Sequence, residues 1–281
     1  MTTEGAADDP QLPHGRDRMS GALDGQVAIV TGAGSATGIG FAIARLLAEQ
    51  GGKVLLAATS DRIHQRVTEL TGQGLTARAF IGDLTDEQVA ADLVAAAEAA
   101  WGRLDIVVNN AGMVSVATGA DASGPLEYVS RSGWDDAMAR NLTTAFLVCR
   151  AAVPALRTNG YGRIVNISSV TGPMVSMPDS APYSAAKAGM LGLTRALAIE
   201  LGRDNITVNA VTPGWIDTES ATDEERASGR ATPVGRPGTA AEVAAAAVFL
   251  ASPAASYVTG TMIVVDGGNS IVEDRSGALW H

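Results

Sequence analysis

The stretch that decides the fold is QVAIVTGAGSATGIG, residues 26–40. Its first six residues, 26–31, form a short apolar run of the kind found in buried strands. Glycine permits sharp turns and lets a phosphate approach the backbone amides at a helix N-terminus. The same residues could also form an ordinary left-handed turn, but their position between a strand and a helix favours a dinucleotide site. The glycines of this turn are Gly32, Gly34, Gly38 and Gly40.

Further apolar or β-branched runs alternate with longer helical patterns, which is the form of repeated βαβ units. The runs are continuously apolar, so helices are expected to cover both faces of the sheet. The sequence predicts a single doubly wound Rossmann-type α/β domain with a seven-stranded parallel sheet, and ligands at the carboxyl ends of its strands. The predicted strands are 26–31, 53–58, 77–82, 104–109, 162–168, 206–211 and 262–267. The helical patterns are 41–50, 86–100, 135–156, 181–201 and 240–252.

The composition describes a globular protein with a large core. Of the 281 residues, 46% are hydrophobic and 18% are charged, and 32 are glycines. A chain of this length forms one large domain or two small ones, and an α/β sheet favours one. We expect residues 23–270 to form this domain, with a mobile tail at residues 1–22 and a C-terminal tail at residues 271–281.

The charge excludes several kinds of partner. A formal net charge of −10 argues against nucleic acid and against an anionic membrane surface, because both require a basic face. The sequence contains neither an apolar run long enough to span a membrane nor a secretory signal, so we expect a cytoplasmic protein. Cys149 is the single cysteine and is expected to be a buried, inert thiol. With three scattered histidines it cannot form a zinc cluster, and no metal is expected.

The end of the second predicted strand bears on the choice of cofactor. An acidic residue there binds the ribose 2′-hydroxyl of NAD, whereas small or basic residues leave room for the 2′-phosphate of NADP. The strand ends in Ala58, Thr59 and Ser60, followed by Asp61 and Arg62. This favours NADP(H), with NAD(H) possible, because Asp61 could contact the ribose, cap a helix or simply be solvated.

Tyr183 and Lys187 lie four residues apart in a helical pattern, hence on one face of a helix. A phenol with a pKa near 10 is a poor base at neutral pH, but a nearby ammonium group favours the phenolate. The pair could therefore move a proton, although such pairs also occur on ordinary helix surfaces.

With these residues the chain resembles the short-chain dehydrogenase/reductases, from about Leu23 to Ser270. It is most similar to the 3-oxoacyl-[acyl-carrier-protein] reductases and related ketone reductases. Seven motifs that occur in the family's order carry the resemblance: the glycine turn, 109–112 (NNAG), Asn141, Ser168-Ser169, the Tyr183/Lys187 pair, Pro213-Gly214 and 265–268 (VDGG).

The resemblance implies a role for each matching residue. Tyr183 would give a proton to a carbonyl oxygen or take one from an alcohol, while hydride passes to or from the nicotinamide. Lys187 would lower the pKa of Tyr183 and hold the nicotinamide ribose, Ser169 would bond the substrate oxygen, with Ser168 as the fallback, and Asn141 would support a proton-relaying water. Its implied cofactor contacts are Gly32, Gly34, Ser35, Thr37, Gly38, Ile39, Gly40, Ala58, Thr59, Ser60, Arg62, Asp83, Leu84, Asn110, Ala111, Gly112, Tyr183, Lys187, Pro213, Gly214, Ile216 and Thr218.

Three of these polar residues have structural alternatives. Asn141 could be a helix-kink or capping amide. Asp83 would lie near the adenine, or would cap the helix that begins near Asp86. Asn109 would run alongside the cofactor, or would stabilise the sheet.

The sequence departs from the family pattern in the loops. Five residues separate Gly32 from Gly38 where three are usual, so the loop is expected to bulge near the phosphates. Residues 113–133 are longer than in similar reductases and either shape the substrate site or form a surface loop. The segment after Gly214, where the family carries a substrate lid, is short and polar.

Two functions remain open. The first is an oxidoreductase acting on a small carbonyl or alcohol substrate, such as a ketone or a 3-oxoacyl group. The second is a non-catalytic, cofactor-binding redox regulator with the same fold. The Asn141, Ser169, Tyr183 and Lys187 set favours the enzyme. By the resemblance we also expect a homotetramer.

Overall fold

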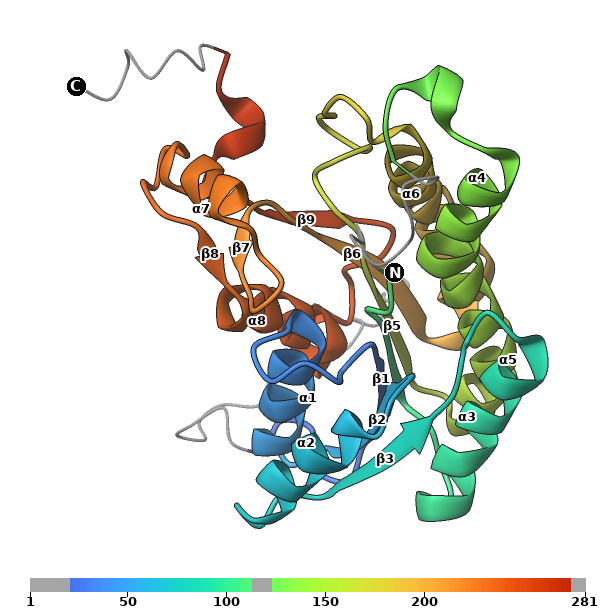
Figure 1. Ribbon diagram of the computed structural model, residues 1–281. Coiled ribbons are helices and arrows are strands. Elements are labelled where there is room, and N and C mark those ends of the chain that lie inside the picture. The colour runs from blue at the N-terminus through green and yellow to red at the C-terminus, as the bar shows by residue number, and fades with distance from the viewer. Residues whose placement is uncertain (1–20, 113–122, 274–281) are drawn as a thin grey trace, which may run out of the picture.

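The central sheet is parallel throughout and has the strand order β3-β2-β1-β4-β5-β6-β9 (Figure 1). The computed structural model describes residues 21–112 and 123–273. The predicted doubly wound α/β fold with a seven-stranded parallel sheet is therefore confirmed. The strands of the sheet are β1 (Val27–Thr31), β2 (Lys53–Ala58), β3 (Ala77–Ile81), β4 (Ile106–Asn109), β5 (Gly162–Ile167), β6 (Ile206–Pro213) and β9 (Met262–Val265).

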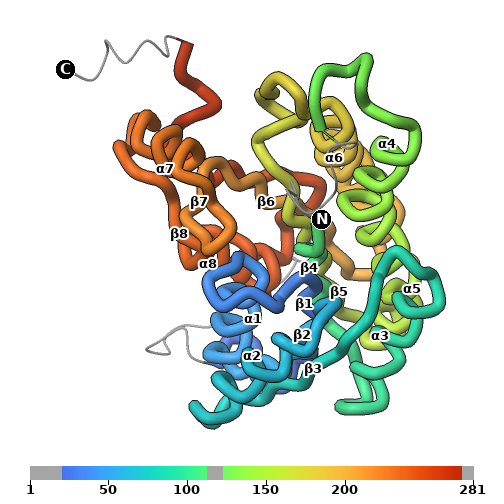
Figure 2. Tube along the Cα trace, viewed as in Figure 1, coloured from blue at the N-terminus to red at the C-terminus, as the bar shows by residue number. Residues whose placement is uncertain are grey.

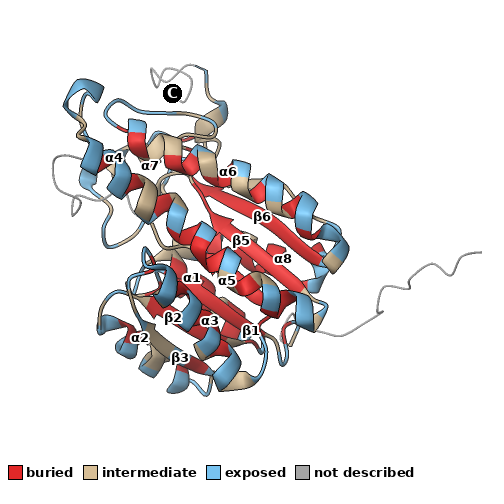
Figure 3. Ribbon diagram, turned by 90° about the vertical axis from the view of Figure 1, so that its right-hand side faces the viewer, coloured by how far each residue is buried: buried red, intermediate tan, exposed pale blue. Residues whose placement is uncertain are grey.

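Helices cover both faces of this sheet. Figures 1 and 3 show α1, α2 and α8 on one face and α3, α5 and α6 on the other. The helices are α1 (Ile39–Glu49), α2 (Arg62–Thr71), α3 (Glu87–Trp101), α4 (Arg131–Met138), α5 (Thr144–Asn159), α6 (Ala181–Leu201), α7 (Asp223–Arg230) and α8 (Ala240–Ala251). Short 3₁₀ turns lie at Leu126–Tyr128, Gly202–Asp204, Pro253–Ala255 and Asn269–Ile271.

The two layers of helices explain why the strands are continuously apolar instead of alternating between apolar and polar residues. In β1, Ala28 and Val30 pack into the core beneath α1 and α8, whereas Val27 and Ile29 pack into the core beneath α3 and α5. Successive side chains of a strand point to opposite faces, and here both faces are buried.

The helix predicted over residues 135–156 is not continuous. A π-helical turn, Ala139–Thr143, separates α4 from α5. The Asn141 amide nitrogen donates to the carbonyl oxygen of Ala137 at 3.1 Å, and the Thr144 hydroxyl donates to the carbonyl of Arg140 at 3.0 Å. Such side-chain bonds to the preceding turn compete with the helical ladder and bend it.

A small unit that the sequence did not predict follows β6. It contains the two-stranded parallel sheet of β7 (Ile216–Asp217) and β8 (Gly238–Thr239), with α7 between them in sequence. Figure 2 shows this orange unit beyond the carboxyl end of the central sheet. It faces the expected ligand-binding edge, where β1 and β4 are neighbours and the order of strands reverses.

Three stretches on which the sequence analysis made predictions lie outside the described residues. These are residues 1–20 and 274–281 of the two tails, and residues 113–122 of the long segment after β4. Across the described ranges, no helix is both long and apolar enough to cross a bilayer.

Candidate functional site

The glycine turn after β1 is packed so closely that two of its positions have no room for a side chain. Gly32 has a φ of +68°, and a Cβ there would lie 2.9 Å from the Cα of Ala111. A Cβ on Gly40 would lie 2.6 Å from the carbonyl oxygen of Gly32. Gly38 occupies the N-cap position of α1 with no side-chain cap, so the first amides of that helix remain accessible to an anion.

Hydrogen bonds join this turn to the loop after β4. The Thr31 hydroxyl accepts from the backbone amides of Asn110 at 3.0 Å and Ala111 at 2.9 Å. The Asn110 side chain donates to the carbonyl oxygens of Thr31 and Gly32, each at 3.0 Å. Two segments far apart in sequence therefore form one rigid edge at the point where the sheet reverses.

Ser35 and Thr37, predicted to lie at the phosphates, contact the segment that follows β7. The Thr37 hydroxyl accepts from the backbone amide of Glu219 at 2.7 Å, and the Ser35 hydroxyl donates to its carboxylate at 3.4 Å. The Gly38 amide closes a turn onto the carbonyl of Ser35 at 3.2 Å, so the extra residues of the loop form a local turn.

The end of β2 presents small and hydroxyl-bearing residues beside a basic one. Arg62 donates through Nε to the Ser60 hydroxyl at 3.5 Å, and both lie beside the exposed Thr59. Asp61 occupies the N-cap position of α2, but its side chain makes no capping hydrogen bond. A Cβ on Gly34 would lie 3.2 Å from the Cβ of Ala58, so this strand end adjoins the glycine turn.

Asp83 does not cap α3. That N-cap is Asp86, whose carboxylate accepts from the amides of Gln88 and Val89. Asp83 accepts from the backbone amide and the hydroxyl of Thr85 at 3.0 and 2.8 Å, and these bonds hold its pKa below the ordinary value. The capping alternative for Asp83 is therefore wrong. Leu84 beside it is buried in the core with α3.

These features fit a bound dinucleotide. Bare backbone lies at the start of α1, the neighbouring loop is fixed by Asn110, and no carboxylate stands at the tip of β2. Such an arrangement provides amides for a pyrophosphate and an open position at the adenosine ribose.

Tyr183 and Lys187 lie on one face of α6, as the sequence predicted, with the Lys187 Nζ 5.6 Å from the centre of the Tyr183 ring. Lys187 is 3% exposed and donates to the carbonyl oxygen of Ile167, at the end of β5, at 3.0 Å. Burial lowers the pKa of this ammonium to about 8. The charged form of Lys187 is thus unfavourable unless a polar or anionic group stabilises it.

The Tyr183 hydroxyl differs from the expectation. Burial raises the pKa of Tyr183 above its ordinary value, a hydrogen bond with Ser169 lowers it, and the negative charge of Glu225 raises it. Burial is the largest of these causes, so the net shift is upward rather than toward neutrality. The sequence could not show this, because the shift depends on how tightly the phenol is enclosed.

The two serines after β5 have different surroundings. Ser168 is buried, and its hydroxyl donates to the backbone carbonyl of Lys187 at 2.9 Å, which ties β5 to α6. Ser169 is partly exposed and lines the cavity with Tyr183, and its hydroxyl accepts from the backbone amide of Thr171 at 3.1 Å. The geometry therefore favours Ser169 over Ser168 as the group that would meet a substrate.

Asn141 lies beneath the cavity rather than in its wall. It is 2% exposed, and a Cβ on Gly112 would lie 2.8 Å from its Oδ1 and 3.3 Å from the Lys187 Nζ. Asn141 and Lys187 thus flank the same glycine, and the π-helical turn directs the Asn141 amide there. The helix-kink alternative describes its local structure and is compatible with a role beside Lys187.

Asn109 stabilises the sheet. Its side-chain amide donates to Asn166 of β5 at 2.9 Å and to the sulfur of Cys149 at 3.2 Å. Cys149 is buried, as predicted, and burial raises the pKa of its thiol to about 12.

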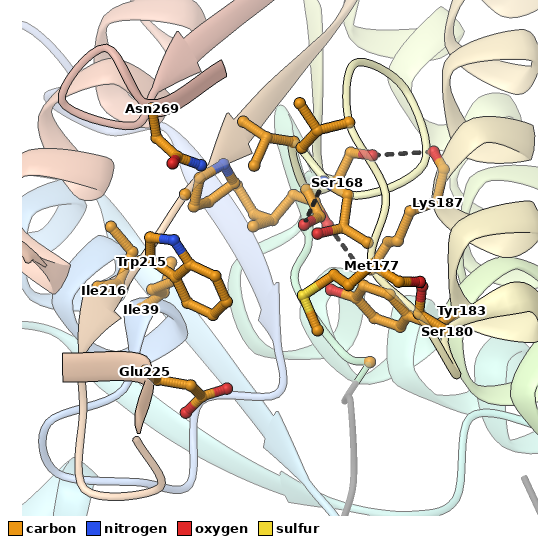
Figure 4. Close-up of a pocket in the computed structure, with 18 of the residues that line it drawn as sticks. Ile39, Ser168, Met177, Ser180, Tyr183, Lys187, Trp215, Ile216, Glu225 and Asn269 are labelled. Carbon is orange, nitrogen blue, oxygen red and sulfur yellow. Dashed lines mark hydrogen bonds between the residues drawn. The ribbon is translucent and has the colours of Figure 1, made fainter. Parts of the chain in front are cut away.

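A cavity of about 540 Å³ lies in front of Tyr183, between the loop after β5 and the small unit after β6 (Figure 4). Of the predicted residues, those that line it are Ser168, Ser169, Tyr183, Lys187, Ile39, Asn110, Gly112, Pro213, Gly214, Ile216 and Thr218. The remaining predicted cofactor residues lie outside its lining, in the glycine turn after β1, at the ends of β2 and β3, and at Ala111 after β4.

Sequence reasoning missed much of the cavity wall. Most of the missed residues follow Ser169 or Gly214, at the carboxyl ends of β5 and β6, and Asn269 follows β9. Ligands of such sheets bind at the carboxyl ends of the strands. That position was the signal that could have identified them. They include Val175, Ser176, Met177, Pro178, Trp215, Ala221, Glu225 and Asn269.

Comparison with known proteins agrees with this geometry. A family model described as enoyl-(acyl carrier protein) reductase matches residues 32–270. The 3-oxoacyl-[acyl-carrier-protein] reductase of Vibrio cholerae is 38% identical over 250 residues, which cover 88% of this chain and 98% of that protein. Gluconate 5-dehydrogenase of Gluconobacter oxydans is 37% identical over 256 residues, which cover 89% of this chain and 96% of that protein.

Among solved structures, a short-chain dehydrogenase/reductase from Burkholderia xenovorans superposes with a TM-score of 0.83 at 36% identity, covering 91% of this chain and all of that one. Fold, motifs and relatives agree over nearly the whole described chain. This chain therefore belongs to the short-chain dehydrogenase/reductase family and is an oxidoreductase that acts on CH–OH or C=O groups.

Proposed function

We propose that this protein is an NAD(P)(H)-dependent oxidoreductase that reduces a ketone or a 3-oxoacyl group to a secondary alcohol, or catalyses the reverse reaction. The observation that carries the proposal is that Ser169, Tyr183 and Lys187 line one cavity, with Lys187 one helical turn from Tyr183 on α6. Two hydroxyls that face one open space can both reach a single substrate oxygen.

When bound, the nicotinamide supplies or accepts the hydride. The Tyr183 hydroxyl donates a proton to the carbonyl oxygen during reduction and takes it back during oxidation. Ser169 donates a hydrogen bond to the same oxygen and stabilises the negative charge that develops there. The raised pKa of Tyr183 keeps the phenol protonated at neutral pH, which suits the direction of carbonyl reduction.

Lys187 and Asn141 support this proton transfer. Lys187, with its pKa lowered to about 8, can exchange a proton near physiological pH. Its ammonium would hold the nicotinamide ribose, and Asn141, which lies beside Gly112 as Lys187 does, would hold a water that connects Lys187 to solvent.

We further propose NADP(H) as the preferred cofactor, with NAD(H) as the alternative. Support comes from the end of β2, where Arg62 and Ser60 stand together and Asp61 is not engaged as a helix cap. A guanidinium and hydroxyls at that position would bind a 2′-phosphate.

The substrate class is supported by the relatives' names. One is named for a 3-oxoacyl group on an acyl carrier protein and another for gluconate, so both act at a carbonyl or secondary alcohol carbon. The fold alone fixes no substrate, because one fold hosts many. We also propose a cytoplasmic location, a domain spanning residues 23–270 and assembly as a homotetramer.

The test is to follow nicotinamide absorbance with NADPH and NADH against a panel of carbonyl compounds. Wild type should turn over, and Tyr183→Phe should lose at least about a hundredfold in kcat while still binding cofactor. Equal rates in the two proteins would remove Tyr183 from the mechanism. Absence of turnover with every substrate, together with tight cofactor binding, would favour the redox-regulator alternative.

A further inference from the structure

The charged groups of the cavity wall lie in two different places. Among the described residues that line it, the charged ones are Lys187 and Glu225. Figure 4 shows Glu225, from α7, across the cavity from Tyr183. Lys187 lies at the buried end, bound to the carbonyl of Ile167, where it serves the reaction. The charge that the body of a substrate would meet is therefore that of Glu225.

The Glu225 carboxylate is held in place. It accepts from the backbone amide of Thr222 at 2.8 Å, and the Thr222 hydroxyl accepts from the Glu225 amide at 3.2 Å, which together form a capping box at the start of α7. A carboxylate fixed in this way cannot swing far from an approaching anion.

The neighbouring arginine does not neutralise Glu225. Arg226 pairs with Asp217 at 2.9 Å and with Asp223 at 3.3 Å. Residues 215–225, several of which line the cavity, hold five acidic residues and no basic one. Among the described lining residues, none beside Glu225 carries a positive charge that could pair with a negative charge on the substrate.

The influence of Glu225 reaches the reacting group. Its charge acts on the Tyr183 hydroxyl, whose pKa it raises. A substrate bound between these two residues lies at least as close to the carboxylate as Tyr183 does. The same charge would therefore repel a substrate carboxylate.

We propose that this cavity takes uncharged ketones and secondary alcohols and rejects carboxylate-bearing ones, with Glu225 as the residue that sets this preference. The inference rests on the proposed function and adds the charge of the substrate to it. Apolar side chains such as Met177, Trp215 and Ile216 would receive the uncharged body of the substrate.

The experiment compares a neutral ester with the corresponding free carboxylate in two pairs: ethyl acetoacetate with acetoacetate, and methyl 4-oxocyclohexanecarboxylate with 4-oxocyclohexanecarboxylate. For wild type we expect kcat/KM to be at least about tenfold higher for each ester. Glu225→Gln should lower this ratio of ester over carboxylate about three- to tenfold. That is the effect expected from the repulsion between two like charges across a cavity that contains some water. Glutamine can complete a capping box, so α7 should keep its start.

Glu224→Gln is the matched control. Glu224 is the exposed neighbour on the same helix and does not line the cavity, so its variant removes the same charge from the chain but should leave the ratio unchanged. A general shift of the Tyr183 pKa in Glu225→Gln affects both members of a pair alike and cancels in the ratio.

The outcomes separate this inference from the proposed function. No turnover with any carbonyl compound would contradict the function itself. Turnover that is equal or faster with the carboxylates, an unchanged ratio in Glu225→Gln, or an equal change in Glu224→Gln would overturn the role of Glu225. If Glu225→Gln does not fold, the ratio of kcat/KM for ester over carboxylate in wild type should still fall as salt is added. A ratio that does not change with salt would contradict the proposal.

Discussion

Lys187 combines a buried position with a group that is costly to bury. The pattern Tyr183-x-x-x-Lys187 was sufficient to predict that the two side chains share a helix face. It was not sufficient to predict their pKa values, because these depend on enclosure by the β5 loop and α7, which are distant in sequence. The sequence thus predicted the chemistry of the pair but not the direction of the Tyr183 shift.

Burial of the Lys187 ammonium costs free energy, and this predicts that the stability of the protein depends on pH. Its pKa falls from 10.5 to about 8 on folding, so the unfolded chain binds more protons between these pH values and stability rises with pH across that window. Lys187→Met should raise the free energy of unfolding by about 1 kcal/mol at pH 7, after the lost bond to Ile167 is discounted, and by much less near pH 10. Urea unfolding at both pH values measures this. Equal destabilisation by Lys187→Met at pH 7 and pH 10 would show that the buried ammonium of Lys187 does not lower the stability of wild type.

The Tyr183 pKa predicts opposite shifts in two variants. Ser169 lowers this pKa and Glu225 raises it. In alcohol oxidation Tyr183 must accept a proton, so the rising limb of kcat/KM against pH should move up in Ser169→Ala and down in Glu225→Gln. Measuring both profiles is decisive, since shifts in the same direction would contradict the assigned causes.

At the level of elements, the strands were predictable and the unit after β6 was not. Continuously apolar runs mark strands buried on both faces, and each predicted run overlaps a strand of the sheet. β7 and β8 have two residues each, too short for any periodicity to reveal. The break between α4 and α5 depends on side-chain bonds of Asn141, which a helical pattern conceals.

The close packing at the start of α1 predicts that a side chain at Gly40 destabilises the fold. A Cβ on Gly40 would lie 2.5 Å from the Asn110 side-chain nitrogen and 2.6 Å from the Gly32 carbonyl oxygen. Gly40→Ala should therefore lower the free energy of unfolding by about 1–3 kcal/mol. Gly202→Ala is the control, since Gly202 has a φ of −59° and open space around its Cα, and it should be neutral or slightly stabilising. Denaturant titration that ranks the two variants the other way would contradict this packing.

The end of β2 predicts the cofactor preference. Ala58→Asp places a carboxylate beside the glycine turn, where it would bond a ribose hydroxyl and repel a 2′-phosphate. We expect the ratio of kcat/KM for NADPH over NADH to fall at least about tenfold. A wild type that already strongly prefers NADH would contradict our interpretation of Thr59, Ser60 and Arg62.

At the level of the whole molecule, exposed apolar side chains are consistent with assembly. Phe146 on α5 is 42% exposed and Ile199 on α6 is 85% exposed, while every residue of the edge strand β9 is partly exposed. Such faces are commonly covered by another subunit. Light scattering should give four times the 28.6 kDa of one chain, and Phe146→Glu should reduce that mass. A monomeric wild type would contradict the expectation.

The central claim is that Tyr183 gives its proton to the carbonyl oxygen as hydride reaches the carbonyl carbon. The most direct measurement uses NADPH deuterated at C4 on its transferred face, with mass spectrometry of the alcohol formed from ethyl acetoacetate. The account predicts an alcohol carrying one deuterium on its carbinol carbon from wild type and essentially none from cofactor-loaded Tyr183→Phe. Labelled alcohol formed equally fast by Tyr183→Phe would contradict it.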